Sequence, residues 1–110
     1  MPSTNGTRKV LLDIHAERTT QNAKWGEQNH PDGTAVFPLA ARREADAARR
    51  ECQALAERGA CTWRAILAEE VAEAFAESDP EKLRKELVQV AAVATAWIEH
   101  LDRRSVSSHE

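Results

Sequence analysis

The stretch that most constrains the fold runs from Thr62 to Leu101 and reads TWRAILAEEVAEAFAESDPEKLRKELVQVAAVATAWIEHL. Its apolar residues recur at helical spacing on both sides of the short turn Ser78-Asp79-Pro80. Asp79 is a good N-cap, and Pro80 suits the first helical position, where a missing backbone N–H costs nothing. The stretch therefore predicts two amphipathic helices. Because their connection is so short, it favours antiparallel packing of the pair.

Two glutamates fall within the apolar stripes of these helices. At about 100° per residue, Glu70 lies on the face formed by Trp63, Leu67, Val71 and Ala74. Glu86 lies on the face formed by Leu83, Val90, Val93 and Trp97. Both are roughly eight residues from the turn, or about 12 Å along each helix. Antiparallel packing would therefore bring the two carboxylates to the same level of a buried seam.

Carboxylates gathered in this way repel one another, and burying one unpaired ion costs several kcal/mol. Protonation, a neighbouring Lys or Arg, or a divalent cation would neutralise them. Glu70 and Glu73 stand at i and i+3, where both can reach one ion, and oxygen ligands suit magnesium or manganese better than zinc. The alternative is that the glutamates are ordinary charges on a solvated helix face, namely Glu69, Glu70, Glu73 and Glu77.

The rest of the chain predicts further helices and one domain. A length of 110 residues suits a single core, and 42% apolar and 30% charged residues with few strand formers favour an all-α fold of about four helices. Apolar spacing predicts two more helices, at 8–22 and 39–58. We expect one helical domain over residues 8–104, with disordered ends at 1–7 and 105–110.

Charge and cysteine content exclude several function classes. A net charge of −3 argues against a non-specific nucleic-acid surface. No run approaches the roughly 20 apolar residues of a membrane span and no signal peptide opens the chain, so we expect a cytoplasmic protein without membrane contact. Cys52 and Cys61 are too few for a disulfide framework or a zinc site. We interpret both as small, partly buried helix residues without a redox role.

The segment from Ala23 to Phe37 (AKWGEQNHPDGTAVF) predicts a long loop, because Gly26, Pro31 and Asp32-Gly33 interrupt regular structure. Long loops in small helical domains are often functional. This one offers a flat ring, a cation and hydrogen-bonding groups, as needed for a nucleotide pocket, in Lys24, Trp25, Gln28, Asn29 and His30. Alternatively, the tryptophan closes the core while the polar groups cap helix ends.

Taken together, these features resemble a known family. Glu70-x-x-Glu73 followed by Glu86-x-x-Gln89 resembles the ExxE…ExxD signature of the MazG-like, all-α nucleoside triphosphate pyrophosphohydrolases. The surrounding TWRAILAEEVAEAF and LRKELVQVAAVATAWIEHL are similar to the family's acidic helices. The upstream ERTTQNAKWGEQNHPDG is similar to the loop after its first helix. The resemblance covers residues 11–103.

The resemblance implies magnesium-dependent hydrolysis (manganese being an alternative) of a nucleoside triphosphate to a monophosphate and pyrophosphate. It also implies that a homodimer or homotetramer completes the helical bundle. By position, the metal ligands would be Glu70, Glu73, Glu86 and Gln89. Gln89 departs from the family's Asp, because an amide coordinates without bringing a negative charge.

Other site residues follow from their place in the chain. Either Glu69 or Glu73 would orient the attacking water. The substrate-binding candidates are Lys24, Trp25, Gln28, His30, Trp63 and Arg64, with either tryptophan able to stack a base.

Two other functions fit parts of the pattern. Gln89 favours a non-catalytic helical module that dimerises or binds a partner, with the acidic seam kept as a structural charge-pair or metal site. A carboxylate-bridged di-iron bundle needs Glu-x-x-His on core helices. The candidate for it, Glu27-x-x-His30, falls in a loop just before Pro31, which disfavours that function.

Overall fold

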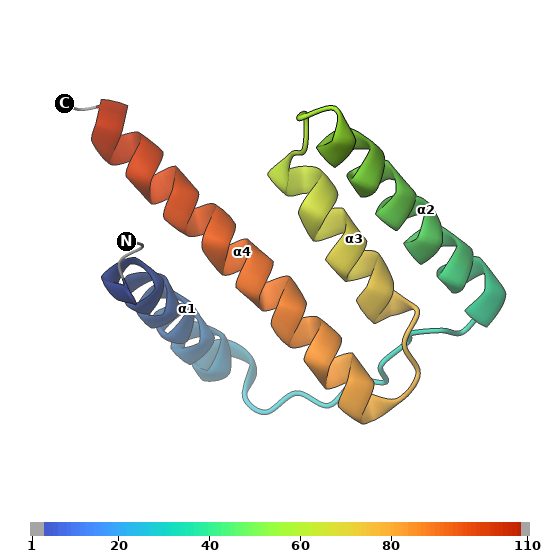
Figure 1. Cartoon of the computed structure of the whole chain (residues 1–110). Coiled ribbons are helices and arrows are strands. Elements are labelled where there is room, and N and C mark those ends of the chain that lie inside the picture. The colour runs from blue at the N-terminus through green and yellow to red at the C-terminus, as the bar shows by residue number, and fades with distance from the viewer. Residues whose placement is uncertain (1–3, 109–110) are drawn as a thin grey trace. The chain divides into compact units, whose positions relative to one another are not determined.

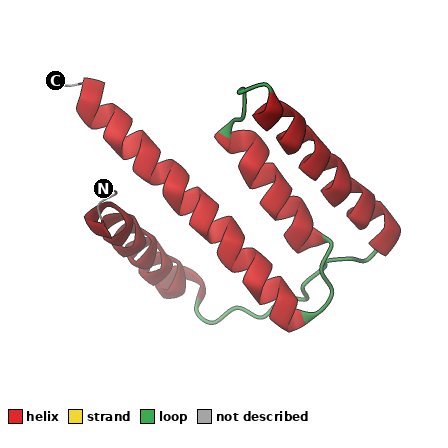
Figure 2. Ribbon diagram, in the orientation of Figure 1, coloured by secondary structure: helices red, strands yellow, loops and turns green. Residues whose placement is uncertain are grey.

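The computed structural model describes residues 4–108, which form four helices and no strand (Figures 1 and 2). In chain order the helices are α1 (Thr4–Trp25), α2 (Pro38–Glu57), α3 (Trp63–Phe75) and α4 (Pro80–Ser108). The predicted all-α fold class is confirmed. Over this described range, each helix is too short or too polar to span a bilayer.

The starts of α3 and α4 and the end of α2 follow local capping rules. Asp79 accepts a hydrogen bond at its Oδ2 from the backbone N–H of Lys82 at 3.0 Å, and Pro80 is the first residue of α4, as predicted. Thr62 does the same for α3, accepting at Oγ1 from the N–H of Ala65 at 3.1 Å. Gly59, with φ of 65°, turns the chain out of α2.

The helices extend further than the sequence predicted at both ends. Helix α1 begins at Thr4 and α4 continues to Ser108, so residues 4–7 and 105–108 are helical where we expected disorder. The rest of those terminal segments, 1–3 and 109–110, lies outside the described residues. The start of α1 has a tertiary partner, because Thr7 Oγ1 donates to Glu99 Oε1 on α4 at 2.8 Å. The end of α4 contains no Gly or Pro to stop it.

The chain groups into two compact units. The single helical domain expected over residues 8–104 stays a prediction. One unit combines the segment up to Pro31 with the segment from Thr95 onward, and the other is Asp32–Ala94, so α4 contributes to both. Within the second unit, α2 and α3 lie side by side (Figure 1). The predicted antiparallel packing of α3 with α4 stays a prediction.

The loop before α2 is tied to the end of α3. The backbone N–H of Ala35 donates to the carbonyl of Phe75 at 2.9 Å, and Thr34 Oγ1 donates to the carbonyl of Glu77 at 2.7 Å. These bonds satisfy two carbonyls at the end of α3 that lack a partner in the helix ladder. Ala35 reaches this position with a φ of 53°, a strained value for a residue other than glycine.

We predict that Asp79→Ala lowers the free energy of unfolding by about 1 kcal/mol, because the first turn of α4 loses its capping acceptor. Asp79→Asn is the control, since an amide oxygen also caps, and it should retain most of the stability. Urea unfolding followed by circular dichroism measures both. Equal stability of Asp79→Ala and the unsubstituted chain would contradict a stabilising role for this cap.

Candidate functional site

Helix α3 carries three half-buried glutamates that point in different directions. Glu69 and Glu73 are four residues apart and share a side of the helix, whereas Glu70 is rotated about 100° from Glu69. The first two meet basic side chains of α2, and Glu70 does not. The sequence predicted one acidic site, and the structure divides these carboxylates between two environments.

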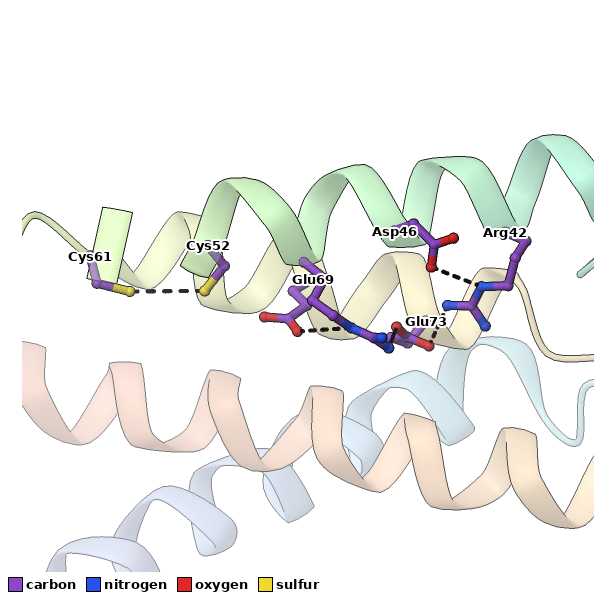
Figure 3. A network of polar contacts seen from close by, with 7 residues as sticks. Arg42, Asp46, Cys52, Cys61, Glu69 and Glu73 are labelled. Carbon is purple, nitrogen blue, oxygen red and sulfur yellow. Dashed lines mark hydrogen bonds and ion pairs between the residues drawn. The ribbon is translucent and has the colours of Figure 1, made fainter. Parts of the chain in front are cut away.

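Glu73 lies between two arginines of α2 (Figure 3). Arg42 Nη2 is 2.8 Å from one carboxylate oxygen of Glu73, and Arg49 Nη2 is 2.5 Å from the other. Burial alone would raise the pKa of Glu73, but the hydrogen bonds from Arg42 and Arg49 outweigh it and hold that pKa below its usual value. The Glu73 carboxylate is therefore ionised, and the positive charges of Arg42 and Arg49 already balance its negative charge.

The polar contacts continue from Glu73 in both directions along α2. Arg42 Nε also pairs with Asp46 at 3.3 Å, one helical turn away. Arg49 Nε lies 3.9 Å from Glu69, whose charge also helps to raise the pKa of the Cys52 thiol. Arg42, the earlier arginine on α2, pairs with Glu73, the later of the two glutamates on α3, whereas Arg49 also reaches the earlier Glu69. The two helices therefore run antiparallel.

Glu70 has the opposite electrostatic environment. It is half-buried, and within the described part of the chain no cation pairs with it. Burial raises the pKa of Glu70, and the negative charges of Glu86, Glu69 and Glu73 raise it further. Glu86 is half-buried on the part of α4 that belongs to the same unit. Its charge therefore reaches Glu70.

The carboxylate oxygens of these residues are suitable ligands for a hard divalent cation, but the side chains are not arranged around one position. Among residues 4–108, no three His, Cys, Asp or Glu side chains are placed to hold a metal. Glu70 and Glu86 offer carboxylate oxygens with uncompensated charge, which magnesium prefers. Glu73 would have to leave its two arginines before it could join them. Gln89 is exposed to solvent.

The residues proposed to bind a base lie mainly in the other unit. Trp25 ends α1, and 62% of its surface is exposed, so it does not close the core. Lys24 Nζ lies 4.9 Å from the centre of the Trp25 ring, a cation–π distance. His30 Nε2 is 3.3 Å from Gln28 Oε1. These residues border a hollow lined by Trp25, Glu27, Gln28 and His30.

The two remaining substrate-binding candidates begin α3, in the unit that carries the glutamates. Trp63 is half-buried and Arg64 is exposed. The structure therefore brings the acidic candidates and the start of α3 together in one unit, and the loop candidates together in the other.

Sequence reasoning did not identify Arg42 and Arg49 as partners of Glu73, or Glu27 as part of the hollow beside Trp25. The two arginines stand among many charged residues on the helix predicted at 39–58, where most charges are expected to form solvated pairs like that between Arg42 and Asp46. The i and i+7 spacing of Arg42 and Arg49 places them on one helix face with the fully buried Ala45. This shared face was the sequence signal that could have predicted contact of both arginines with a neighbouring helix.

No protein-family model, curated protein or solved structure matches this chain.

We predict opposite pH effects from two glutamine substitutions. The raised pKa of Glu70 means that the folded chain binds this proton more tightly than the unfolded chain, so this contribution to stability falls as pH rises above the usual 4.5. Glu70→Gln should therefore raise the free energy of unfolding near pH 7 and remove that decline. Urea unfolding between about pH 4 and pH 8 measures it.

Glu73 gives the matched comparison. Its lowered pKa stabilises the fold above the usual 4.5, and that stability is lost as pH falls through the folded value. Glu73→Gln should cost about 1 kcal/mol at pH 7, a small amount because Arg42 and Arg49 are 47% and 48% exposed. Destabilisation of the same size at pH 7 by both substitutions would contradict the division of the carboxylates.

Proposed function

We propose that this chain is a magnesium-dependent nucleoside triphosphate pyrophosphohydrolase of the MazG-like all-α family that its sequence resembles. The observation that carries the proposal is the Glu70 carboxylate. It is half-buried, has no cation partner in the described chain, and lies within reach of the charge of Glu86. Such a site gains free energy from binding a divalent cation, because the cation removes the repulsion between the carboxylates.

In this proposal Glu70 and Glu86 are the first metal ligands, and Glu73 and Gln89 complete the set. When bound, magnesium lowers the pKa of a water molecule and stabilises charge on the leaving pyrophosphate. Glu69 or Glu73 orients the attacking water. The negative charge of the triphosphate requires this cation, since the carboxylates alone would repel it.

Arg42 and Arg49 are the chain's own counter-ions for Glu73. If Glu73 becomes a metal ligand, both guanidinium groups lose their present partner. Guanidinium groups bind phosphate oxygens well, so the released arginines would be available to the triphosphate. Arg64, exposed at the start of α3, is a further phosphate-binding candidate.

The base would stack on one of two tryptophans. The exposed ring of Trp25 supports the first choice, with Lys24, Gln28 and His30 supplying polar contacts around it. Trp63, half-buried at the start of α3, is the second. Stacking on an aromatic ring tolerates different bases, so this part of the proposal leaves the base open.

Exposed apolar surface supports the proposed homodimer or homotetramer. Phe37, Leu39 and Phe75 are 76%, 75% and 60% exposed in the single chain. Within the described residues, the buried apolar side chains are Val10, Ala45, Ala74 and Leu83. Large exposed apolar side chains beside so small a core favour burial against further copies of the chain.

We predict that the purified chain with magnesium releases pyrophosphate from at least one nucleoside triphosphate in a panel of canonical and modified substrates. Glu70→Ala should lower the rate by about a hundredfold or more, because the pair with Glu86 loses one oxygen donor. Glu81→Ala is the control, since Glu81 is an exposed glutamate in the first turn of α4. Absence of pyrophosphate from every substrate, or equal release by Glu70→Ala, would contradict the proposal.

We also predict that the α2 arginines compete with the metal. Replacing both by alanine (Arg42→Ala with Arg49→Ala) should tighten manganese binding about tenfold in calorimetric titration without nucleotide, because Glu73 no longer has to leave a partner. The control replaces Arg43 and Arg50, which are exposed on the same helix and show no ion pair in the described chain. An equal gain in both double variants would indicate a general charge effect instead.

A second candidate is favoured by the ion pairs themselves. Because Glu73 is already neutralised by Arg42 and Arg49, the acidic helix face also fits a non-catalytic module that dimerises or binds a partner. Titration of the chain with magnesium and a non-hydrolysable nucleotide separates the two functions. The enzyme should bind the nucleotide in the presence of magnesium, whereas the module should not.

A further inference from the structure

The chain's two cysteines meet where α2 is connected to α3. Cys52 is half-buried near the end of α2, and Cys61 is exposed two residues before α3 begins. Their sulfur atoms are 3.9 Å apart (Figure 3). The interpretation of both as partly buried helix residues is therefore wrong for Cys61, which lies outside the helices.

Local structure on both sides of the turn keeps these thiols together. Gly59 and Ala60 donate backbone hydrogen bonds to Ala56 and Leu55 at 3.0 and 2.8 Å, which folds the chain back over the last turn of α2. The Thr62 cap then starts α3 directly. The pairing of α2 with α3 holds the two segments antiparallel beyond the turn. The approach of the sulfur atoms follows from this framework.

We propose that Cys52 and Cys61 are a modification site, at which a peroxide converts the two thiols into a reversible intramolecular disulfide. The sulfur atoms must approach from 3.9 Å to the bond length of about 2.05 Å. Cys61 has no helix to restrict it, so it can make this movement. The pair lies nine residues apart in sequence, which gives a short closed loop.

Accessibility sets the order of the two steps. The exposed Cys61 thiolate attacks one oxygen of hydrogen peroxide, which forms a sulfenic acid and releases hydroxide. The Cys52 sulfur then attacks the Cys61 sulfur, and the hydroxyl group leaves as water with the proton of the Cys52 thiol. Together, the two thiols lose two electrons and two protons, and the peroxide becomes two water molecules.

The environment of Cys52 supports its role as the thiol that reacts in the second step. Burial is the main cause that raises the pKa of the Cys52 thiol to about 11, with the nearby Glu69 and Cys61 contributing, so Cys52 is protonated and reacts only slowly with peroxide directly. The charge of Glu69 reaches Cys52, and Glu69 also pairs with Arg49, which places the modification site next to the candidate acidic site.

The test treats the full chain with hydrogen peroxide, alkylates the remaining thiols and measures the intact mass and the peptide map. The expected product has lost two hydrogen atoms per chain, contains one peptide pair joined through Cys52 and Cys61, and returns to the starting mass with dithiothreitol. Its melting temperature should rise by roughly 10 °C, since the bond constrains the unfolded chain. Neither the metal nor the nucleotide is needed for this result.

Single variants identify the order of reaction. Cys52→Ser should stop at a sulfenic acid on Cys61 that a dimedone probe traps, whereas Cys61→Ser should leave most of its Cys52 thiol free for alkylation under the same treatment. Peroxide-treated chains that keep both thiols, or that become linked to other chains on a non-reducing gel, would overturn the proposal. Oxidation of Cys61 to a sulfinic acid without a disulfide would overturn it as well.

Discussion

The interaction on which the described site depends is the pairing of the Glu73 carboxylate with the two guanidinium groups of Arg42 and Arg49. It joins residues 24 and 31 positions apart, and it sets α2 antiparallel to α3. A half-buried carboxylate needs a counter-charge, and on this side of α3 the chain supplies its own. Because the arginines remain about half exposed, the pairing orders the helices without making a large contribution to stability.

The same helix leaves its other carboxylate without a counter-charge. Glu70 lies one residue from Glu69 but faces a different neighbour, and burial together with the charge of Glu86 raises its pKa. A fold selected only for stability gains nothing from two carboxylates within range of each other. Their nearness is the physical reason for proposing a cation there, and the resemblance of the acidic pattern to the MazG-like signature is an independent reason from sequence. In that proposal, the participation of Glu73 as a ligand would depend on the arginines.

The ion pairs of α2 and α3 form one connected series from Asp46 to Glu69, and the contact between Cys52 and Cys61 lies beyond its end (Figure 3). A change at the Glu73 carboxylate would release both arginines. Charge-assisted contacts that share partners respond together, because each guanidinium group has a limited number of donors to distribute. The ion pairs of the candidate site therefore belong to one interface between α2 and α3.

The sequence alone determined the helical class and the local signals that start and stop helices. Asp79, Pro80 and Gly59 act through their own backbone neighbours, so their effect can be read without any tertiary contact. Only the tertiary structure decided that α2 lies beside α3, that Arg42 and Arg49 meet Glu73, and that helix replaces the disorder expected at residues 4–7 and 105–108. The reason is that a helical pattern specifies which face a residue occupies but not which helix covers that face. The carboxylates of α3 were visible in the sequence, whereas their neighbours came from segments that the pattern does not connect.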